Sequence, residues 1–126
     1  MLENTKTFSS FSVNDLEKAK TFYEKSLGLK VSQSNGMLEL ESKDGSKTMI
    51  YPKPNHEPAT FTVLNFAVPD VNKAVDDLVS AGVKFEHYDS EHMKTNAKGI
   101  VEEDGSPKIA WFKDPAGNIL SVLQEN

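Results

Sequence analysis

The sequence predicts an α+β fold made of two tandem βαβββ units within one domain, residues 1–126. The first observation is length, because 126 residues suit one domain with its own core. The second is an internal repeat: the nine residues from Phe11 and the nine from Phe66 coincide at five positions, at an offset of 55. The third is that short β-rich runs, separated by turn residues, follow each copy.

The first unit is expected to span about 6–52. Residues 7–13 are rich in Phe, Ser and Val, which favours a strand. Asp15 is a helix N-cap signal, apolar residues follow at helical spacing, and Gly28 stands where a helix end favours positive φ. Three further strands are predicted over 29–33, 37–41 and 48–51.

The second unit is expected over about 60–124, after a proline-rich linker at 52–60. It repeats the order of the first: a strand, a helix beginning after Asp70, and Gly82 after the helix. The remaining strands are predicted over 83–88, 109–112 and 119–123.

The two copies differ in a long polar segment, residues 89–107, which is punctuated by glycine. A loop of this length in a compact domain is either a functional lid or a mobile segment. The candidate lid residues are His92, Lys94 and Lys98.

Composition excludes several classes of function. The net charge is −5 and the chain has no Arg, which argues against nucleic acid as a partner. It has no Cys, so disulfides and thiolate chemistry are absent. No apolar run approaches the roughly 18 residues that a membrane helix needs, and residues 1–6 lack the apolar core of a signal peptide. We therefore expect a cytoplasmic protein without membrane partners.

Residues 13–29 match V-x-D-L-E-K-A-x-x-F-Y-x-x-x-L-G-L, and residues 111–118 are similar to a pattern F-x-D-P-x-G-N. With the βαβββ repeat, these motifs resemble the vicinal oxygen chelate superfamily, which includes glyoxalase I, extradiol dioxygenases, bleomycin resistance proteins and fosfomycin-modifying enzymes. The resemblance implies a cupped mixed sheet, in which two units from one chain or from two chains close a pocket. It also implies a homodimer, because many members pair.

In the metal enzymes of this family, four inward positions carry His, Glu or Gln. The corresponding positions here hold Phe8, Val63, Ser121 and one of Met49, Ile50 and Tyr51. None of these is an ordinary ligand of a hard cation or of Zn²⁺. The three histidines also lack ligand spacing. We therefore predict no metal and no other cofactor.

Strand alternation indicates which residues would line a pocket. If Phe8 faces inward, Ser10 does too, and the repeat adds Val63 and Asn65. A buried Asn on such a strand would need a hydrogen-bond partner. Glu39 and Glu41 are expected to lie on one face of their strand, which we interpret as a solvated face of the sheet. The predicted ligand-binding residues are Phe8, Ser10, Tyr51, His56, Val63, Asn65, Trp111 and Ser121.

These features predict a metal-independent small-molecule-binding protein with an aromatic or apolar ligand. The missing Arg and the acidic charge favour a neutral or cationic one. The alternative is a glyoxalase-like lyase or isomerase, or a dioxygenase, with displaced metal ligands. A third possibility is an interaction domain whose interior is filled.

Overall fold

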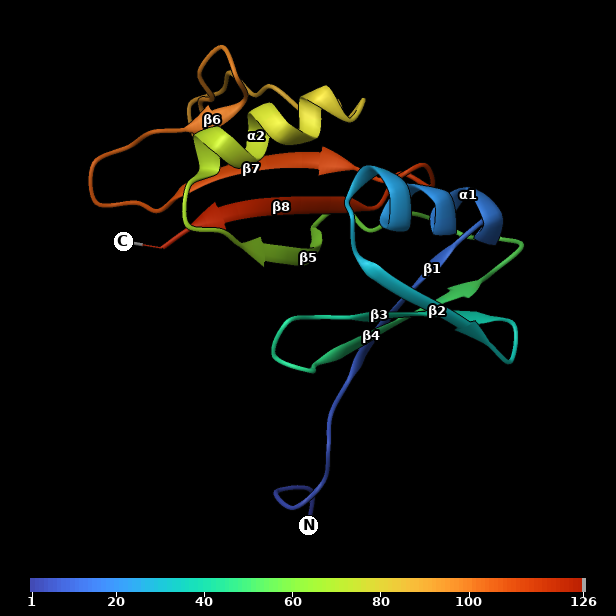
Figure 1. Cartoon of the computed structure of the whole chain (residues 1–126). Coiled ribbons are helices and arrows are strands. Elements are labelled where there is room, and N and C mark those ends of the chain that lie inside the picture. Colours follow the sequence, from blue (N-terminus) through green and yellow to red (C-terminus); the bar gives the residue numbers. More distant parts are fainter. Residues whose placement is uncertain (126) are drawn as a thin grey trace. The chain divides into compact units, whose positions relative to one another are not determined.

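The computed structural model describes residues 1–125 and divides into two compact units, Met1–Glu57 and Pro58–Asn126 (Figure 1). The boundary lies within the segment 52–60 that the sequence assigns to the linker. Each unit contains one four-stranded mixed sheet and follows the predicted βαβββ order. Over the described residues, no helix is long and apolar enough to cross a membrane.

The sheet of the first unit has the order β1-β4-β3-β2. The two strands in its middle, β3 and β4, are the last two strands of the unit in sequence. β1 runs parallel to β4, and the other two pairings are antiparallel. The predicted strands are present. They are β1 (Ser9–Val13), β2 (Lys30–Ser34), β3 (Met37–Glu41) and β4 (Lys47–Pro52).

The predicted helix of the first unit forms, but its second half is wider than an α-helix. The Asp15 side chain accepts a hydrogen bond from the Lys18 N–H at 3.1 Å and begins α1 (Leu16–Thr21). The chain continues as a π-helix, η1 (Phe22–Ser26), in which the Leu27 N–H donates to the Phe22 carbonyl at 3.0 Å. Gly28 then adopts a φ of +71°, as predicted for its position.

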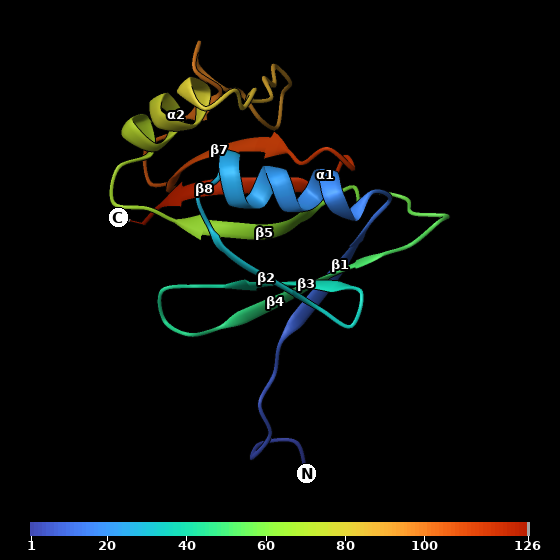
Figure 2. The ribbon, with the colours of Figure 1, turned by 45° about the vertical axis from the view of Figure 1, so that its right-hand side comes forward.

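One face of this sheet carries the core of the unit, and the helix covers that face (Figure 1). The opposite face holds the alternate residues, which stay at least partly exposed. The chain begins with a turn in which the Thr5 N–H donates to the Leu2 carbonyl at 3.0 Å, and residues 6–8 then lead into β1 (Figure 2). The buried apolar residues of the unit are Phe11, Val13, Ala19, Tyr23, Leu38, Leu40 and Ile50.

The sheet of the second unit has the order β5-β8-β7-β6, which matches the first position by position. Asp70 caps α2 by accepting from the Lys73 N–H at 3.1 Å, and α2 packs against β7 and β8. Gly82 has a φ of +95°. The elements are β5 (Thr62–Ala67), α2 (Val71–Ser80), β6 (Ile100–Val101), β7 (Lys108–Lys113) and β8 (Ile119–Gln124).

The edge of this second sheet differs from the prediction, which had a strand over 83–88. The chain touches β7 only briefly there: Phe85 bridges to Phe112, and the Glu86 N–H donates to the Trp111 carbonyl at 2.8 Å. It then leaves the sheet and returns as β6. The prediction of a continuous strand was wrong because the edge is built from two pieces, and the second lies within the predicted loop.

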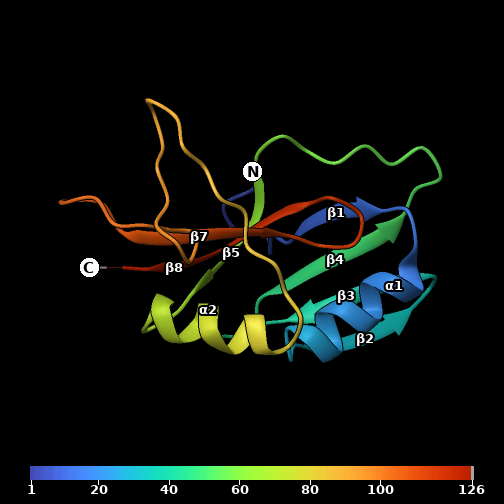
Figure 3. The same ribbon diagram turned by 90° about the horizontal axis from the view of Figure 1, so that it is seen from above.

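The excursion between these pieces, residues 87–99, is named the tongue (Figure 3). It is internally hydrogen-bonded like a narrow hairpin. The Thr95 N–H donates to the Tyr88 carbonyl at 2.9 Å, and the Ser90 N–H donates to the Met93 carbonyl at 2.8 Å. The sequence left open whether this region is a lid or a mobile segment, and these hydrogen bonds define its conformation in the structure.

Candidate functional site

Strand register shows which side chains share the face opposite each helix. In the first unit Met49 lies beside Ser10 on one side and Glu39 on the other. In the second unit Ser121 lies in the same way between Asn65 and Trp111. Directly paired residues project from the same face of a sheet. The two rows are therefore equivalent positions of the two units.

This equivalence resolves a question that the sequence left open. Met49, rather than Ile50 or Tyr51, is the counterpart of Ser121, because it pairs with Ser10 as Ser121 pairs with Asn65. Ile50 is fully buried on the helix side. The same argument places Trp111 on the open face of its sheet, whereas Phe112 is fully buried in the core.

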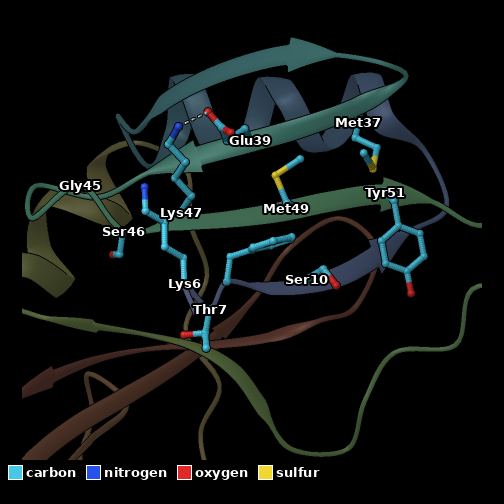
Figure 4. A pocket seen from close by; sticks show the side chains of 11 residues that line it. Lys6, Thr7, Ser10, Met37, Glu39, Gly45, Ser46, Lys47, Met49 and Tyr51 are labelled. Atoms are coloured by element: carbon cyan, nitrogen blue, oxygen red, sulfur yellow. Dashed lines mark ion pairs between the residues drawn. The ribbon is translucent and has the colours of Figure 1, made fainter. Parts of the chain in front are cut away.

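The open face of the first unit carries a pocket of about 690 Å³ (Figure 4). Residues from β1, β3 and β4, together with the segment before β1, surround it. Three of the predicted ligand-binding residues line it: Phe8, Ser10 and Tyr51. The full lining is Lys6, Thr7, Phe8, Ser10, Met37, Glu39, Gly45, Ser46, Lys47, Met49 and Tyr51.

Charged groups gather at one end of this pocket. The Lys47 Nζ lies 3.6 Å from the Glu39 Oε2, and the Ser32 hydroxyl donates to the same carboxylate at 3.4 Å. Beside them, Glu41 accepts from Lys30 at 2.8 Å, and this hydrogen bond holds the pKa of Glu41 below its ordinary value. The carboxylate of Glu39 is thus a partly buried group inside the pocket.

The sequence interpretation missed Glu39 as a pocket residue, although the signal was available. Glu39 alternates with Leu38 and Leu40, which are buried. In β1 the sequence correctly predicts that Phe11 and Val13 face the core and that Ser10 faces the other way. Leu38 and Leu40 face the core in the same manner, so Glu39 lies on the same face of the sheet as Ser10. Met37, Lys6 and Lys47 were missed as well, because their proximity depends on the pairing of strands distant in sequence.

The second unit carries its own pocket of about 490 Å³. Its wall is aromatic: the rings of Tyr88 and Trp111 are 5.7 Å apart in a T-shaped arrangement. The Trp111 indole N–H donates to the Thr62 hydroxyl at 3.1 Å, which fixes the ring. The lining is Thr60, Phe61, Thr62, Tyr88, Ser90, His92, Met93, Trp111 and Ile119.

Two predicted site residues of the second unit pair with each other. The fully buried Ser121 hydroxyl donates to the Asn65 side-chain carbonyl. The sequence argument treated Asn65 as buried, but it is exposed, and neither residue is among the lining of the second unit's pocket. Val63 lies in a bulge of β5, half-buried and without a register partner, and Thr62 takes the place opposite Ile119.

The remaining predicted residues are spread over both units. His56 shares a hydrogen bond of 2.7 Å with the Ser12 hydroxyl and does not line the first unit's pocket. Of the three lid candidates, His92 lines the aromatic pocket, and Lys94 lies at a separate shallow hollow of about 350 Å³. Lys98 is bound to α2 through an ion pair with Asp76 at 2.9 Å.

The four family metal positions contain no carboxylate and no imidazole. Phe8 and Val63 have no donor atom, Ser121 is a neutral hydroxyl already in a hydrogen bond, and Met49 offers only a soft thioether. Within residues 1–125, no group of three or more His, Cys, Asp or Glu is placed to hold a metal ion. The residues present do not fit a metal of the family type.

Comparison with known proteins agrees with this architecture. The sequence profile of the Glyoxalase/Bleomycin resistance protein/Dioxygenase superfamily matches residues 8–122, and the chain belongs to this superfamily. The predicted family and fold class are confirmed. A shared fold does not fix an activity, so membership of this superfamily leaves the activity open.

Individual relatives cover nearly the whole chain. The protein YraH of Bacillus subtilis (strain 168), described as uncharacterized, is 28% identical over 89% of this chain and 91% of its own. A glyoxalase family protein from Bacillus anthracis superposes with a TM-score of 0.75 at 14% identity, covering all of both chains. TnmS3, an antibiotic binding protein from Streptomyces sp. CB03234, gives a TM-score of 0.69 at 21% identity, covering 98% of both chains.

Proposed function

We propose that this protein binds a small organic molecule with an aromatic or apolar body and does so without a metal ion. The observation that carries the proposal is the first unit's pocket. It lies on the open face of a family sheet whose metal positions hold Phe8 and Met49. Pockets with mostly apolar walls and a few polar groups are typical of small-molecule sites.

A second feature supports the same proposal. The second unit has a pocket on the corresponding face, and its walls are the rings of Phe61, Tyr88 and Trp111. Such rings contribute large apolar contact area and stack on planar ligands. TnmS3, an antibiotic binding protein with a similar fold, is in line with a binding role for this scaffold. The predicted alternative, an enzyme with displaced metal ligands, would need a cluster of donor groups, and residues 1–125 contain no group of three or more His, Cys, Asp or Glu placed to hold a metal ion.

The four methionines allow a direct test of occupancy. Met37 and Met49 line the first unit's pocket, Met93 lines the second unit's pocket, and Met1 lies in neither. We would label the methionine methyl groups and record their NMR signals while titrating a panel of aromatic compounds in the presence of a chelator. A saturable shift at Met37, Met49 or Met93, with Met1 unchanged, is expected.

Two results would contradict the proposal. The first is that no compound of a broad aromatic panel moves any of the three pocket methyl signals. The second is that shifts occur only after Zn²⁺, Ni²⁺, Mn²⁺ or Fe²⁺ is added and vanish with chelator. Elemental analysis of the purified protein supplies the independent control, with well under one equivalent of each metal expected.

The homodimer and the cytoplasmic location belong to the proposal as well. The first rests on the family resemblance and the second on composition. Light scattering coupled to size-exclusion chromatography tests the dimer, because a mass near twice the 14.0 kDa of the chain is expected. A mass near that of one chain at all concentrations would contradict it.

A further inference from the structure

We infer that the first unit's pocket selects an amphipathic anion: a molecule with an apolar body and one carboxylate, sulfonate or phosphate group at its end. This inference rests on the proposed binding function and specifies its ligand. Lys6 and Lys47 receive the anionic group, while Met37, Met49 and Tyr51 contact the body.

The two lysines lie at the same end of the pocket because of strand pairing. β1 and β4 are parallel, and Ser9 pairs with Thr48. Lys47 is the first residue of β4 and Lys6 lies three residues before β1, so both stand where the two parallel strands begin. Their side chains lie at the same end of the pocket (Figure 4). Among the described residues Lys6 has no hydrogen-bond or ion-pair partner, so its charge is available to a ligand.

The acidic groups near this end are already engaged. Glu39 shares its carboxylate between Lys47 and Ser32, Glu41 is paired with Lys30, and Asp44 accepts from the Ser46 N–H and hydroxyl. The Lys47–Glu39 contact is long, at 3.6 Å, and lies partly in solvent, where ion pairs are weak. Lys47 is therefore able to turn toward an incoming anion, while Glu39 keeps the hydrogen bond from Ser32.

The other end of the pocket is apolar. Met37 and Tyr51 lie there, and Met49 lies between the two ends (Figure 4). Lys47 and Tyr51 are on one strand, so at about 3.3 Å per residue the two ends are roughly 13 Å apart. That length suits two or three rings. Thioether side chains adapt their shape to such rings and make favourable contacts with them.

The local charge thus differs from the charge of the whole chain. A net charge of −5 without Arg predicts a neutral or cationic ligand. In this pocket, however, the lining contains two lysines and one glutamate. Short-range interactions with these groups outweigh the distant charges, because solvent and salt screen charges beyond roughly 10 Å.

Two dyes with one aromatic skeleton provide the test. Anilinonaphthalene sulfonate carries an anionic group, and phenylnaphthylamine is its neutral counterpart. We would titrate each dye and follow the methyl signals of Met37 and Met49, with Met93 reporting separately on the second unit. The sulfonate is expected to bind the first unit's pocket at least about tenfold more tightly, which corresponds to about 1.4 kcal/mol.

Charge variants make the test specific. Lys6→Gln and Lys47→Gln are each expected to weaken the sulfonate about threefold and to change the affinity for the neutral dye clearly less, because a surface ion pair contributes up to about 1 kcal/mol. Glu39→Gln is expected to strengthen the sulfonate about twofold to threefold, since it frees Lys47. Lys25→Gln, an exposed residue of η1, is the control for a change of net charge.

The results separate this inference from the proposed function. If both dyes shift Met37 and Met49 at equal concentrations, or if Lys6→Gln and Lys47→Gln behave like Lys25→Gln, the anion selectivity is wrong and small-molecule binding stands. If no ligand of either charge moves these two methyl signals, the first unit's pocket is not a binding site and the inference fails with it.

Discussion

The two units share one scaffold but differ at the edges of their sheets. In the first unit the edge strand β2 runs directly into β3 through the two-residue turn Asn35-Gly36, both residues with positive φ. In the second unit the edge is interrupted by the tongue, residues 87–99. The comparison shows that a long extra segment can be placed at the edge of a sheet while the two central strands pair as they do in the other unit.

The difference extends to the chemistry of the pockets. Glu39 and Trp111 occupy equivalent positions beside Met49 and Ser121. The first unit therefore presents charged and thioether groups, while the second presents aromatic rings, with the tongue contributing Tyr88 and further lining residues. Glu39 and Trp111 can differ in this way because both side chains stay partly exposed and lie outside the buried core of their units.

The largest expected effect on stability comes from Asp114, in the turn between β7 and β8. Asp114 is buried and accepts from the Ala116 N–H, the Asn118 N–H and the Asn118 side-chain amide, all within 3.0 Å. Asp114→Ala would leave these donors unpaired and is expected to lower the free energy of unfolding by about 3 kcal/mol. Urea unfolding followed by Trp111 fluorescence measures it.

The first unit offers the matched control for this change. Asp44 accepts from the Ser46 N–H and hydroxyl in the corresponding turn, but it is exposed. Water can replace the carboxylate there, so Asp44→Ala is expected to cost clearly less. Equal losses for the two variants would show that burial of the turn is not the cause.

The next effect concerns the close contact between the two ends of the tongue, where Gly99 lies beside Glu86. Gly99 has a φ of +86°, and a Cβ there would lie 2.9 Å from the Glu86 carbonyl oxygen. Gly99→Ala is therefore expected to cost about 2–3 kcal/mol and to shift the Met93 methyl signal. Gly36→Ala, at a φ of +74° with open space around it, is expected to cost only about 1 kcal/mol. Similar costs for both would mean that the close contact with Glu86 does not constrain the edge.

A smaller effect separates the two central positions of the open faces. Ser121→Ala removes the hydrogen bond to Asn65 and is expected to cost about 1 kcal/mol, since Asn65 stays in contact with water. Met49→Leu, at the equivalent position, is expected to change stability by less than about 0.5 kcal/mol. Thermal unfolding of the two variants measures both values, and a larger loss for Met49→Leu would reverse the comparison.

The smallest effect is electrostatic. Because Lys30 holds the pKa of Glu41 below the ordinary value of 4.5, the ionised carboxylate stabilises the folded state above that pH. This contribution is lost as the pH falls through the lowered pKa. NMR titration of the Glu41 carboxyl group is expected to give a pKa below 4.5, which returns toward 4.5 in Lys30→Gln. An unchanged pKa in that variant would exclude the ion pair as its cause.

Much of the fold could be predicted from the sequence because its signals are local. The caps Asp15 and Asp70, the glycines after each helix and the alternation along β1 each depend on a few neighbouring residues. The continuous strand 83–88 was wrong for the opposite reason. Whether an edge segment stays on the sheet depends on tertiary pairing: the chain bridges to β7 only at Phe85, and β6, which follows the tongue, pairs with the next part of the same strand.

The sites divide in the same way. The sequence by itself determined the family and which residues of β1 and β8 share a face, since these follow from motif spacing and from the two-residue period of a strand. Only the tertiary structure decided that Lys6 lies beside Lys47. That proximity arises because β1 and β4 run parallel from Ser9 and Thr48 onward, so the segments that lead into them, about 40 positions apart in sequence, begin at the same end of the sheet.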